Sequence, residues 1–427
     1  MPTAPDPLDE FRALAASYPR CVWLDGGGGR EWSGRRSLLA GLSDDDVSLS
    51  YDASTREVRR WVGAPGRWRS QVVGDDVFAV LERELADAPG AQWFGYLGYA
   101  ARPDLPALVD PDDPLPTAVW MRPSRVRVVE HPPADAAPAP PGESDDTGPV
   151  PASYAEAFAR VQEALHAGDS YEVNLTYRRT VTSDRPPAEV YARLRAASPA
   201  PYAGFLQHAV DDETGRAPAW LLSASPERYA RIEPGPTPGT RTITAKPMKG
   251  TTPRGATPAD DEALRRALVE DPKIRAENLM IVDLLRNDVG AVSRAGTVRV
   301  PTLMTTESYA AVHQLVSVVT GELRADVGTV EALRTLFPAG SMTGAPKLRT
   351  MEVVAAVEAT PRGAYAGAFG WISGDGRADL GVVIRSLTSP DGRTWTVGTG
   401  GGVTVRSDLA DEHAESRWKV ERLLRAL

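Results

Sequence analysis

The amino-acid sequence predicts an α+β fold, in which strands and helices alternate irregularly along the chain. Two observations favour this class. Short apolar runs bounded by glycine, proline and aspartate recur along the chain and are typical of strands. Between them lie longer segments whose apolar residues recur at helical spacing. With 427 residues, the chain is long enough for one large fold or two domains, and it carries no internal repeat.

Residues 1–130 form the first predicted region, which we expect to be α+β. It contains the strand-like runs CVWLDG, DDVSLSYD and FGYLGYA. One helix is expected over residues 76–86. The four glycines from Gly26 to Gly29 lack the spacing of a phosphate-binding loop and predict a turn. Residues 131–152 follow, and their prolines and small polar side chains predict a linker without a packed core.

Residues 153–427 form the second and larger predicted region. Ser153 is placed to cap a helix that ends at Gly168, because apolar residues recur there at helical spacing. Strand-like runs follow in the order YEVNLTYRRTV, AWLLSAS, TITAKPMKG, GAFGWIS, LGVVIRSLTS and WTVGTGGGVTV. Further helices are expected over residues 260–285, over residues 348–358 and from Leu409 onward.

The composition and charge exclude several classes of function. Acidic residues outnumber basic residues by 57 to 48, and the net charge of -9 argues against a nucleic-acid-binding protein. Cys21 is the only cysteine, so neither an internal disulfide nor a cysteine-based zinc site can form. The chain begins with acids and prolines, and it has no apolar run of the roughly 18 residues that a membrane span needs. We therefore expect a cytoplasmic protein with neither nucleic acid nor membrane as a partner.

Two residues that lie close to prolines are candidates for acid and nucleophile chemistry. Glu227, in SPERY, follows a proline at the end of a strand-like run, where it can act as a general acid. Taken alone, an acid at a strand end is more often a solvated surface group. Lys249, in PMKGTTPRG, is expected on a constrained turn. Most such lysines are exposed charges, and a nucleophilic role needs a neutral, partly desolvated amine.

Acidic residues on two predicted helices are candidates for metal binding. Glu277 lies on a helix that is apolar on several sides, so its polar groups need partners. Glu412 and Glu415 share one face of the last helix, and Lys419 lies one turn beyond Glu415. An exposed, ion-paired helix is the plainer interpretation of this pattern. Together with Glu277, however, these carboxylates offer the hard oxygen ligands that Mg²⁺ prefers.

Three further features are compatible with either a structural or a binding role. The run GTGGG contains Gly400, Gly401 and Gly402 and follows a strand, so its backbone N–H groups can bind a carboxylate. Arg385, in VVIRS, is either an ion-pair partner at the edge of the core or a bidentate clamp for a carboxylate. His313 is equally compatible with a buried structural role and with proton transfer.

These segments, in this order, resemble the chorismate-binding family, which includes the large chains of anthranilate, aminodeoxychorismate, isochorismate and salicylate synthases. The motifs that carry the resemblance are GDSYEVNLT, SPERY, PMKGT, ENLMIVDLLRND, GSMTGAPK, IRS and SDLADEHAESRWK. The resemblance implies an α+β fold of large antiparallel sheets flanked by helices, with the active site in a cleft. It also implies that residues 153–427 are the chorismate-binding catalytic domain and that residues 1–130 are an N-terminal region like that of anthranilate synthase component I.

The resemblance assigns roles to the candidate residues. Glu277 and Glu415 match the magnesium-binding carboxylates of the family, and Glu412 is a nearby partner that acts through water. Arg385 matches the clamp for the enolpyruvyl carboxylate of chorismate. The other expected substrate contacts are the backbone of Gly400, Gly401 and Gly402, the residues Ser341 and Thr343 in GSMTGAPK, Trp371 in place of a family tyrosine, and Lys419.

Lys249 points to one branch of the family. Anthranilate synthases usually read P-I-A-G-T where this chain reads P-M-K-G-T, and lysine there is the signature of aminodeoxychorismate synthases. The implied reaction is attack of Lys249 on the chorismate ring, proton donation from Glu227 to the departing hydroxyl, and displacement of the lysine by ammonia. The product is 4-amino-4-deoxychorismate, a precursor of p-aminobenzoate and folate. We expect the Lys249 pKa to lie below the roughly 10.4 of a free lysine, and His313 to be a third catalytic residue.

The source of ammonia is expected to be a second polypeptide. Cys21, in YPRCVWLD, lacks the surroundings of a glutaminase nucleophile, so we expect a glutamine amidotransferase subunit as the partner in a heterodimer. Two related alternatives are an anthranilate synthase component I and an aminodeoxyisochorismate synthase. A non-catalytic, chorismate-binding regulatory subunit is an alternative of another class, and the intact Glu227, Lys249, Glu277 and Glu415 disfavour it.

Overall fold

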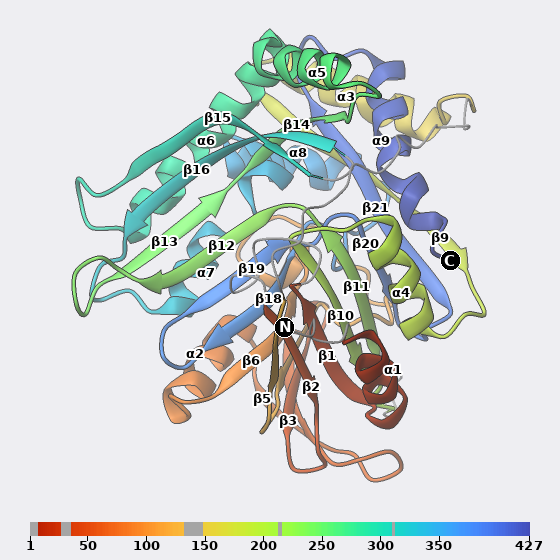
Figure 1. The fold of residues 1–427 in the computed structure, drawn as a ribbon, viewed down its shortest axis with the longest axis vertical. Coiled ribbons are helices and arrows are strands. Elements are labelled where there is room, and N and C mark those ends of the chain that lie inside the picture. Colours follow the sequence, from red (N-terminus) through yellow and green to blue (C-terminus); the bar gives the residue numbers. More distant parts are fainter. Residues whose placement is uncertain (1–6, 27–35, 132–147, 212–215, 310–311) are drawn as a thin grey trace.

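The structure, a computed structural model, describes residues 7–26, 36–131, 148–211, 216–309 and 312–427. Antiparallel sheets and flanking helices make up this part of the chain (Figure 1), which confirms the predicted α+β class. Of the predicted turn from Gly26 to Gly29, the last three glycines lie outside the described residues, as does most of the predicted linker. No described helix is both long enough and apolar enough to cross a membrane.

Two sheets form the framework, and the strand pairs found among the described residues are antiparallel. The first sheet has the order β17 (Gly344–Ala345), β9 (Glu172–Thr182), β21 (Thr394–Val403), β20 (Ser386–Ser389), β11 (Ala219–Ser225), β10 (Tyr202–His208), β1 (Arg20–Asp25), β2 (Arg36–Gly41) and β8 (Arg127–Glu130). The second has the order β14 (Met248–Pro253), β16 (Val312–Glu322), β13 (Arg241–Lys246), β12 (Arg228–Pro234), β19 (Ala378–Val382), β18 (Ala368–Ser373), β6 (Gln92–Leu97), β7 (Ala118–Arg122), β3 (Val47–Asp52), β4 (Glu57–Val62) and β5 (Arg69–Gly74), with β15 (Arg299–Ser308) also paired to β16.

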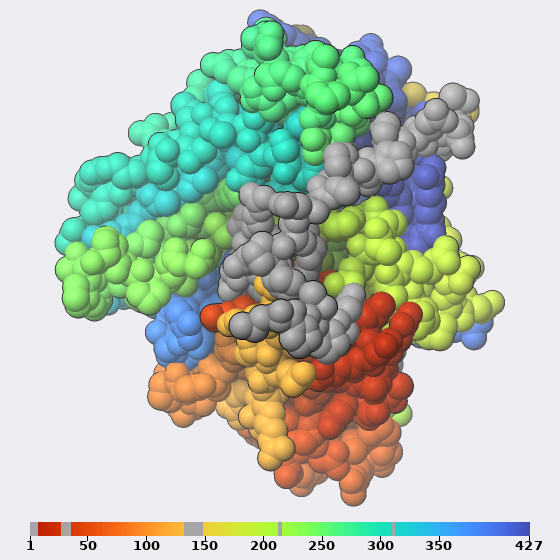
Figure 2. All heavy atoms as spheres, viewed as in Figure 1, coloured from red at the N-terminus to blue at the C-terminus, as the bar shows by residue number. Residues whose placement is uncertain are grey.

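The helices pack against these sheets from several sides. They are α1 (Leu8–Ser17), α2 (Val77–Asp87), α3 (Ala152–His166), α4 (Pro187–Ala197), α5 (Pro258–Glu270), α6 (Pro272–Val292), α7 (Thr329–Leu336), α8 (Lys347–Val357) and α9 (Leu409–Leu424), with short 3₁₀ turns at Tyr99–Ala101 and Gly340–Met342. Helices α5 and α6 lie beside β14 and β16 at one end of the molecule, and α9 lies along β21 (Figure 1). Figure 2 shows α5 at the upper end of this face and the N-terminal strands at the lower end.

The two predicted regions are interwoven, because each sheet contains strands from both. In the first sheet β1 pairs with β10, and in the second sheet β6 pairs with β18. The sequence boundary at residues 131–152 therefore does not separate two independent sheets. One consequence is a shared aromatic core, in which Phe11 and Trp23 pack against Tyr191 and Phe205 with ring centroids 4.7 to 5.8 Å apart. Such pairs each add about 0.5–1.5 kcal/mol beyond the area they bury.

Local chemistry explains where the observed elements depart from the predicted ones. The helical block expected over residues 260–285 is two helices, because Pro272 begins α6 and Asp271 caps it by accepting hydrogen bonds from the backbone N–H groups of residues 273 and 274. Ser153 lies inside α3 and does not cap it. The run LGVVIRSLTS is divided into β19 and β20, and Arg385 lies between them with a positive φ of 49°. This backbone conformation is costly for a residue other than glycine and recurs at functional sites.

Candidate active site

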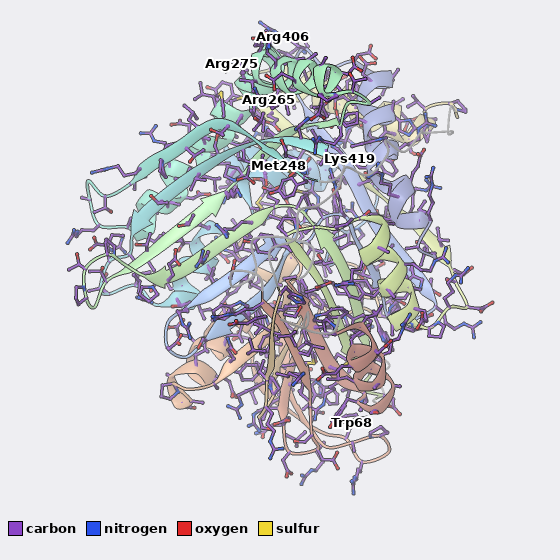
Figure 3. All side chains as sticks on the ribbon, viewed as in Figure 1. Trp68, Met248, Arg265, Arg275, Arg406 and Lys419 are labelled. Atoms are coloured by element: carbon purple, nitrogen blue, oxygen red, sulfur yellow. The ribbon has the colours of Figure 1, made fainter. Side chains whose placement is uncertain are left out.

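A cavity of about 130 Å³ lies where β14, β21, α6 and α9 come together. Met248 of β14 and Lys419 of α9 both line it, and their side chains lie close to each other in Figure 3. The structure brings ten of the predicted site residues to this cavity, namely Glu227, Lys249, Glu277, Ser341, Arg385, Gly400, Gly401, Gly402, Glu415 and Lys419. These residues are spread over more than 190 positions of the sequence, so the fold itself assembles the site.

An irregularity in β14 directs Lys249 into the cavity. The pairing of β14 with β16 changes register between Met248 and Thr251, which is the signature of a β-bulge. Gly250 has a φ of +85°, and a Cβ there would lie 2.6 Å from the side chain of Ile274. Only glycine fits this bulge without displacing α6. Lys249 therefore lies on a bulged strand and not on the predicted turn.

Glu172 determines the protonation of Lys249. The Lys249 ammonium donates a hydrogen bond to the Glu172 carboxylate, and Glu172 is 1% exposed. Desolvation lowers the pKa of Lys249, but the negative charges of Glu172, Glu277 and Glu227 raise it by more, so the net pKa lies above its ordinary value. The expectation of a lowered pKa is therefore wrong for this structure. The reason is the group of carboxylates around the amine, of which the buried Glu172 is the nearest.

Glu227 is a buried acid and not a solvated group at a strand end. It lies between β11 and β12, is 4% exposed, and accepts a hydrogen bond of 2.6 Å from the Ser341 hydroxyl. Burial raises its pKa to about 7, against the opposing effects of Ser341 and Lys249. A carboxyl group with this pKa holds a proton for part of the time at neutral pH, as a general acid must.

The predicted metal carboxylates lie on two facing helices. Glu277 of α6 and Glu415 of α9 line the cavity. Burial raises the pKa of Glu277 to about 7, and the charge of Lys249 opposes this rise. Glu415 forms an ion pair with Lys419, with 2.9 Å between Oε1 and Nζ, and the positive charge of Lys419 lowers the pKa of Glu415. Glu412 does not line the cavity, because it is buried and its Oε1 accepts a hydrogen bond of 2.7 Å from Lys273.

The donor set fits a magnesium ion that is held partly by water and substrate. The described residues contain no ready-made cluster of three or more His, Cys, Asp or Glu side chains for a metal. Mg²⁺ commonly uses only one or two protein carboxylates and keeps several waters. Glu277 and Glu415 supply two carboxylates, and burial raises the pKa of Glu277 despite the opposing charges of Lys249 and Lys273. A bound divalent cation would balance it.

The glycine run of β21 forms one wall, and Gly400 and Gly402 leave no room there for a Cβ. A Cβ at Gly402 would lie 2.1 Å from Glu172 Oε1 and 3.0 Å from Lys249 Nζ. The carbonyl oxygen of Gly400 accepts a hydrogen bond of 3.0 Å from Lys419. The glycines thus let Lys249, Glu172 and Lys419 approach the backbone closely.

Three other predicted site residues do not line the cavity. His313 is buried, with Nδ1 2.7 Å from Ser308 Oγ and Nε2 3.0 Å from Asp261 Oδ1. Trp371 of β18 is buried in a hydrophobic cluster. Thr343 is fully buried and donates a hydrogen bond of 3.2 Å to the carbonyl oxygen of Gly340. Their roles at the site remain predictions from the family resemblance.

The residues of the site that the sequence did not predict include Glu172, Asn174 and Tyr365. Asn174 and Tyr365 line the cavity, and Glu172 lies behind Lys249. Glu172 and Asn174 are two apart on β9, so alternation along a strand places their side chains on one face. This alternation within YEVNLT was the available signal. Tyr365 comes from the segment before β18, and no periodic pattern marked it.

Comparison with known proteins identifies the family. The family model for chorismate binding enzymes matches residues 67–425, so the chain belongs to this family. Three relatives are similar in sequence. The chain is 36% identical to the aminodeoxychorismate synthase of Streptomyces pristinaespiralis, over 99% of this chain and 64% of the relative. It is 41% identical to aminodeoxychorismate synthase component 1 of Klebsiella aerogenes, over 64% of this chain and 57% of the relative. It is 34% identical to anthranilate synthase component 1 of Streptomyces coelicolor, over 83% of this chain and 78% of the relative.

The chain spans less than two thirds of the length of the two aminodeoxychorismate synthases.

Solved structures confirm the fold. Anthranilate synthase component I from Streptococcus pneumoniae superposes with a TM-score of 0.69 at 24% identity, covering 91% of this chain and 92% of that chain. The menaquinone-specific isochorismate synthase of Escherichia coli superposes with a TM-score of 0.62 at 17% identity, covering 98% of each chain.

Proposed function

We propose that this chain is the ammonia-using subunit of an aminodeoxychorismate synthase, which converts chorismate and ammonia to 4-amino-4-deoxychorismate. The observation that carries the proposal is the position of Lys249, in the cavity wall together with Glu227 and in contact with Glu172. A lysine at this position offers a nucleophile that an alanine cannot. The aminodeoxychorismate synthases among the relatives, at 36% and 41% identity, support this branch of the family over the anthranilate synthase at 34%.

Chorismate carries two carboxylates, and the cavity offers a separate binding group for each. In the proposed complex, Glu277 and Glu415 hold Mg²⁺, which would supply positive charge for the ring carboxylate. The backbone N–H groups from Gly400 to Gly402 face the same carboxylate. Arg385 binds the enolpyruvyl carboxylate through its planar guanidinium. These contacts fix the ring with one side towards Lys249.

The proposed first step needs two proton transfers, one away from Lys249 before it attacks and one to the hydroxyl as it departs. Lys249 transfers a proton to a base, and Glu172, which already accepts its hydrogen bond, is the carboxylate placed to receive it. The neutral amine then bonds to the ring carbon at the far end of the diene, the double bonds shift, and the hydroxyl departs from the other end as water with the proton of Glu227. Ammonia next displaces the lysine with an allylic shift, so the new amine occupies the carbon that bore the hydroxyl. Glu227, now ionised, accepts a proton from the incoming ammonia and is ready for another cycle.

We propose a glutamine amidotransferase as the partner that supplies ammonia in the cytoplasm. Cys21 is buried in β1, and burial raises the pKa of its thiol, whereas a glutaminase nucleophile needs a lowered pKa and access to substrate. Two of the relatives are each named component 1, which supports the idea of a second component. Synthesis of p-aminobenzoate, and from it folate, is the proposed use of the product.

A direct assay tests this function. The purified chain is incubated with chorismate and Mg²⁺, together with either an ammonium salt or glutamine, and the product is identified by mass and absorbance. We expect 4-amino-4-deoxychorismate with the ammonium salt and no turnover with glutamine. Formation of anthranilate would instead assign the chain to the anthranilate synthases. Turnover of glutamine by the chain alone would contradict the need for a partner.

A further inference from the structure

A second cavity adjoins the proposed active site on the side of α9. It shares Arg385, Lys419 and Leu423 with the first cavity. Its other walls include Trp418 and Arg422 of the same helix. The two cavities therefore meet at the side chains of Arg385 and Lys419.

The described residues that line the second cavity include basic side chains but no acidic ones. Arg385, Lys419 and Arg422 line it, and none of its described lining residues is Asp or Glu. Lys419 has a partner in Glu415, at 2.9 Å. Within the described ranges, no hydrogen bond or ion pair is found for the guanidinium of Arg385 or of Arg422. Two neighbouring guanidinium groups without an acceptor are costly to desolvate, and an anion between them would remove this cost.

The electrostatics of Arg385 support the proximity of these two groups. Burial lowers the pKa of Arg385 to about 10, and the charge of Arg422 lowers it further, while Glu415 and Glu227 oppose the shift. Arg385 is also held in a left-handed backbone conformation, with a φ of 49°. Such strain persists where the surrounding structure fixes a side chain in place. Arg385 is therefore held near a second cation that repels it.

Helix α9 connects the two ends of the compartment. Glu415, Lys419 and Arg422 are four and three residues apart, so they lie on one face of the helix. Glu415 lies at the proposed metal end, and Arg422 lies at the end that contains Arg385. This face therefore presents groups for two separate carboxylates on one rigid element.

We propose that Arg422, together with Arg385, binds the enolpyruvyl carboxylate and makes the site selective for a dianionic substrate. The inference rests on the proposed function, since it takes chorismate as the substrate. The two guanidinium groups approach the carboxylate from different elements, α9 and the segment between β19 and β20. A monocarboxylate such as benzoate engages only the metal end and gains nothing from Arg422.

Three variants of the full chain test the proposal. Arg422→Met removes the charge and keeps a similar length, and Arg422→Lys keeps the charge without the planar fork. Arg425→Met, at the C-cap of α9, is a control outside both cavities. We expect Arg422→Met to raise the KM for chorismate roughly ten-fold or more, as for loss of one hydrogen bond to a charged group, with kcat changed much less. Arg422→Lys should restore part of this loss, and Arg425→Met should match the wild type.

Inhibition by benzoate distinguishes loss of one carboxylate contact from a general disruption of the cavity. Its inhibition constant should be the same in the wild type and in Arg422→Met, because it has no second carboxylate. The proposal is overturned if KM for chorismate does not change, or if chorismate and benzoate weaken together. If the wild type proves unable to turn over chorismate, the proposed function fails, and calorimetric titration of chorismate into the wild type and Arg422→Met still decides the role of Arg422.

Discussion

Burial acts on the two reactive side chains of this site in different ways. Glu227 is surrounded by protein, and burial raises its pKa to about 7 although hydrogen bonds from the Ser341 hydroxyl and the Met248 backbone and the charge of Lys249 oppose the rise. Lys249 is also buried, which lowers its pKa, but the hydrogen bond and charge of Glu172 together with the charges of Glu277 and Glu227 outweigh desolvation and keep the amine protonated. The resting site thus holds a protonated lysine and a partly protonated acid. The proposed reaction requires Lys249 to lose its proton before it attacks and Glu227 to keep its proton until the hydroxyl departs.

The pKa of Glu227 predicts how the rate depends on pH. Because the folded pKa is raised to about 7, the carboxyl is protonated below this pH and ionised above it. The first step uses the protonated form, so the rate at a fixed concentration of unprotonated ammonia should fall as pH rises through about 7. Glu227→Gln should lose roughly 10²- to 10⁴-fold in kcat at all pH values and should lack this transition. A rate that is constant around pH 7 in the wild type would remove Glu227 from the role of acid.

The proposed metal site predicts the behaviour of two further variants. Glu277→Gln and Glu415→Gln each remove one anionic oxygen, and calorimetry should show Mg²⁺ affinity weakened by at least the roughly ten-fold that even an outer-shell change costs. Activity should fall in parallel and recover partly at high Mg²⁺. Asp411→Asn, an exposed acid on α9 that does not line the cavity, is the control. Normal activity in both variants without dependence on Mg²⁺ would show that the ligands are assigned wrongly.

At the scale of elements, strand irregularities and glycines position the reactive groups. The bulge in β14 directs Lys249 into the cavity, and the glycines of β21 leave room for Glu172 and Lys419. The sequence predicted strands and helices well where apolar spacing was regular, as in α2 and α9. It did not predict the bulge, because a one-residue change of register leaves no periodic signal. It also missed Glu172, because a strand-internal acid acquires meaning only when pairing brings it to Lys249.

The fit of β21 against Lys249 predicts the effect of a single methyl group. Gly402→Ala would place a Cβ 2.1 Å from Glu172 Oε1 and 3.0 Å from Lys249 Nζ, so these side chains must move. A displacement of about 1 Å can cost on the order of 10²-fold in rate, and we expect such a loss in kcat. Gly401→Ala is the matched comparison, because its Cβ would approach Glu412 Oε2 only to 3.2 Å. Similar activity in both alanine variants would contradict this account of the wall.

At the scale of the whole molecule, the site depends on sheets that run through both predicted regions. Strand β6, from the N-terminal region, pairs with β18, and β1 pairs with β10. The motifs and their order were sufficient to indicate the family and most of the cavity wall. They could not show that the two regions share their sheets, because strand pairing across more than 180 residues depends on tertiary packing. They also placed Trp371 near the substrate, whereas the fold buries it in the core and brings Tyr365 to the cavity.

The central claim is that Lys249 forms a covalent bond to the substrate, and mass spectrometry tests it most directly. The wild-type chain is mixed with chorismate and Mg²⁺ in the absence of ammonia, then digested. We predict a mass increase of one chorismate less one water on the peptide that contains Lys249, and loss of this adduct when an ammonium salt is added. Lys249→Ala should fold, form no adduct and lose on the order of 10³-fold or more in rate. Near-wild-type production of 4-amino-4-deoxychorismate by Lys249→Ala would contradict the account.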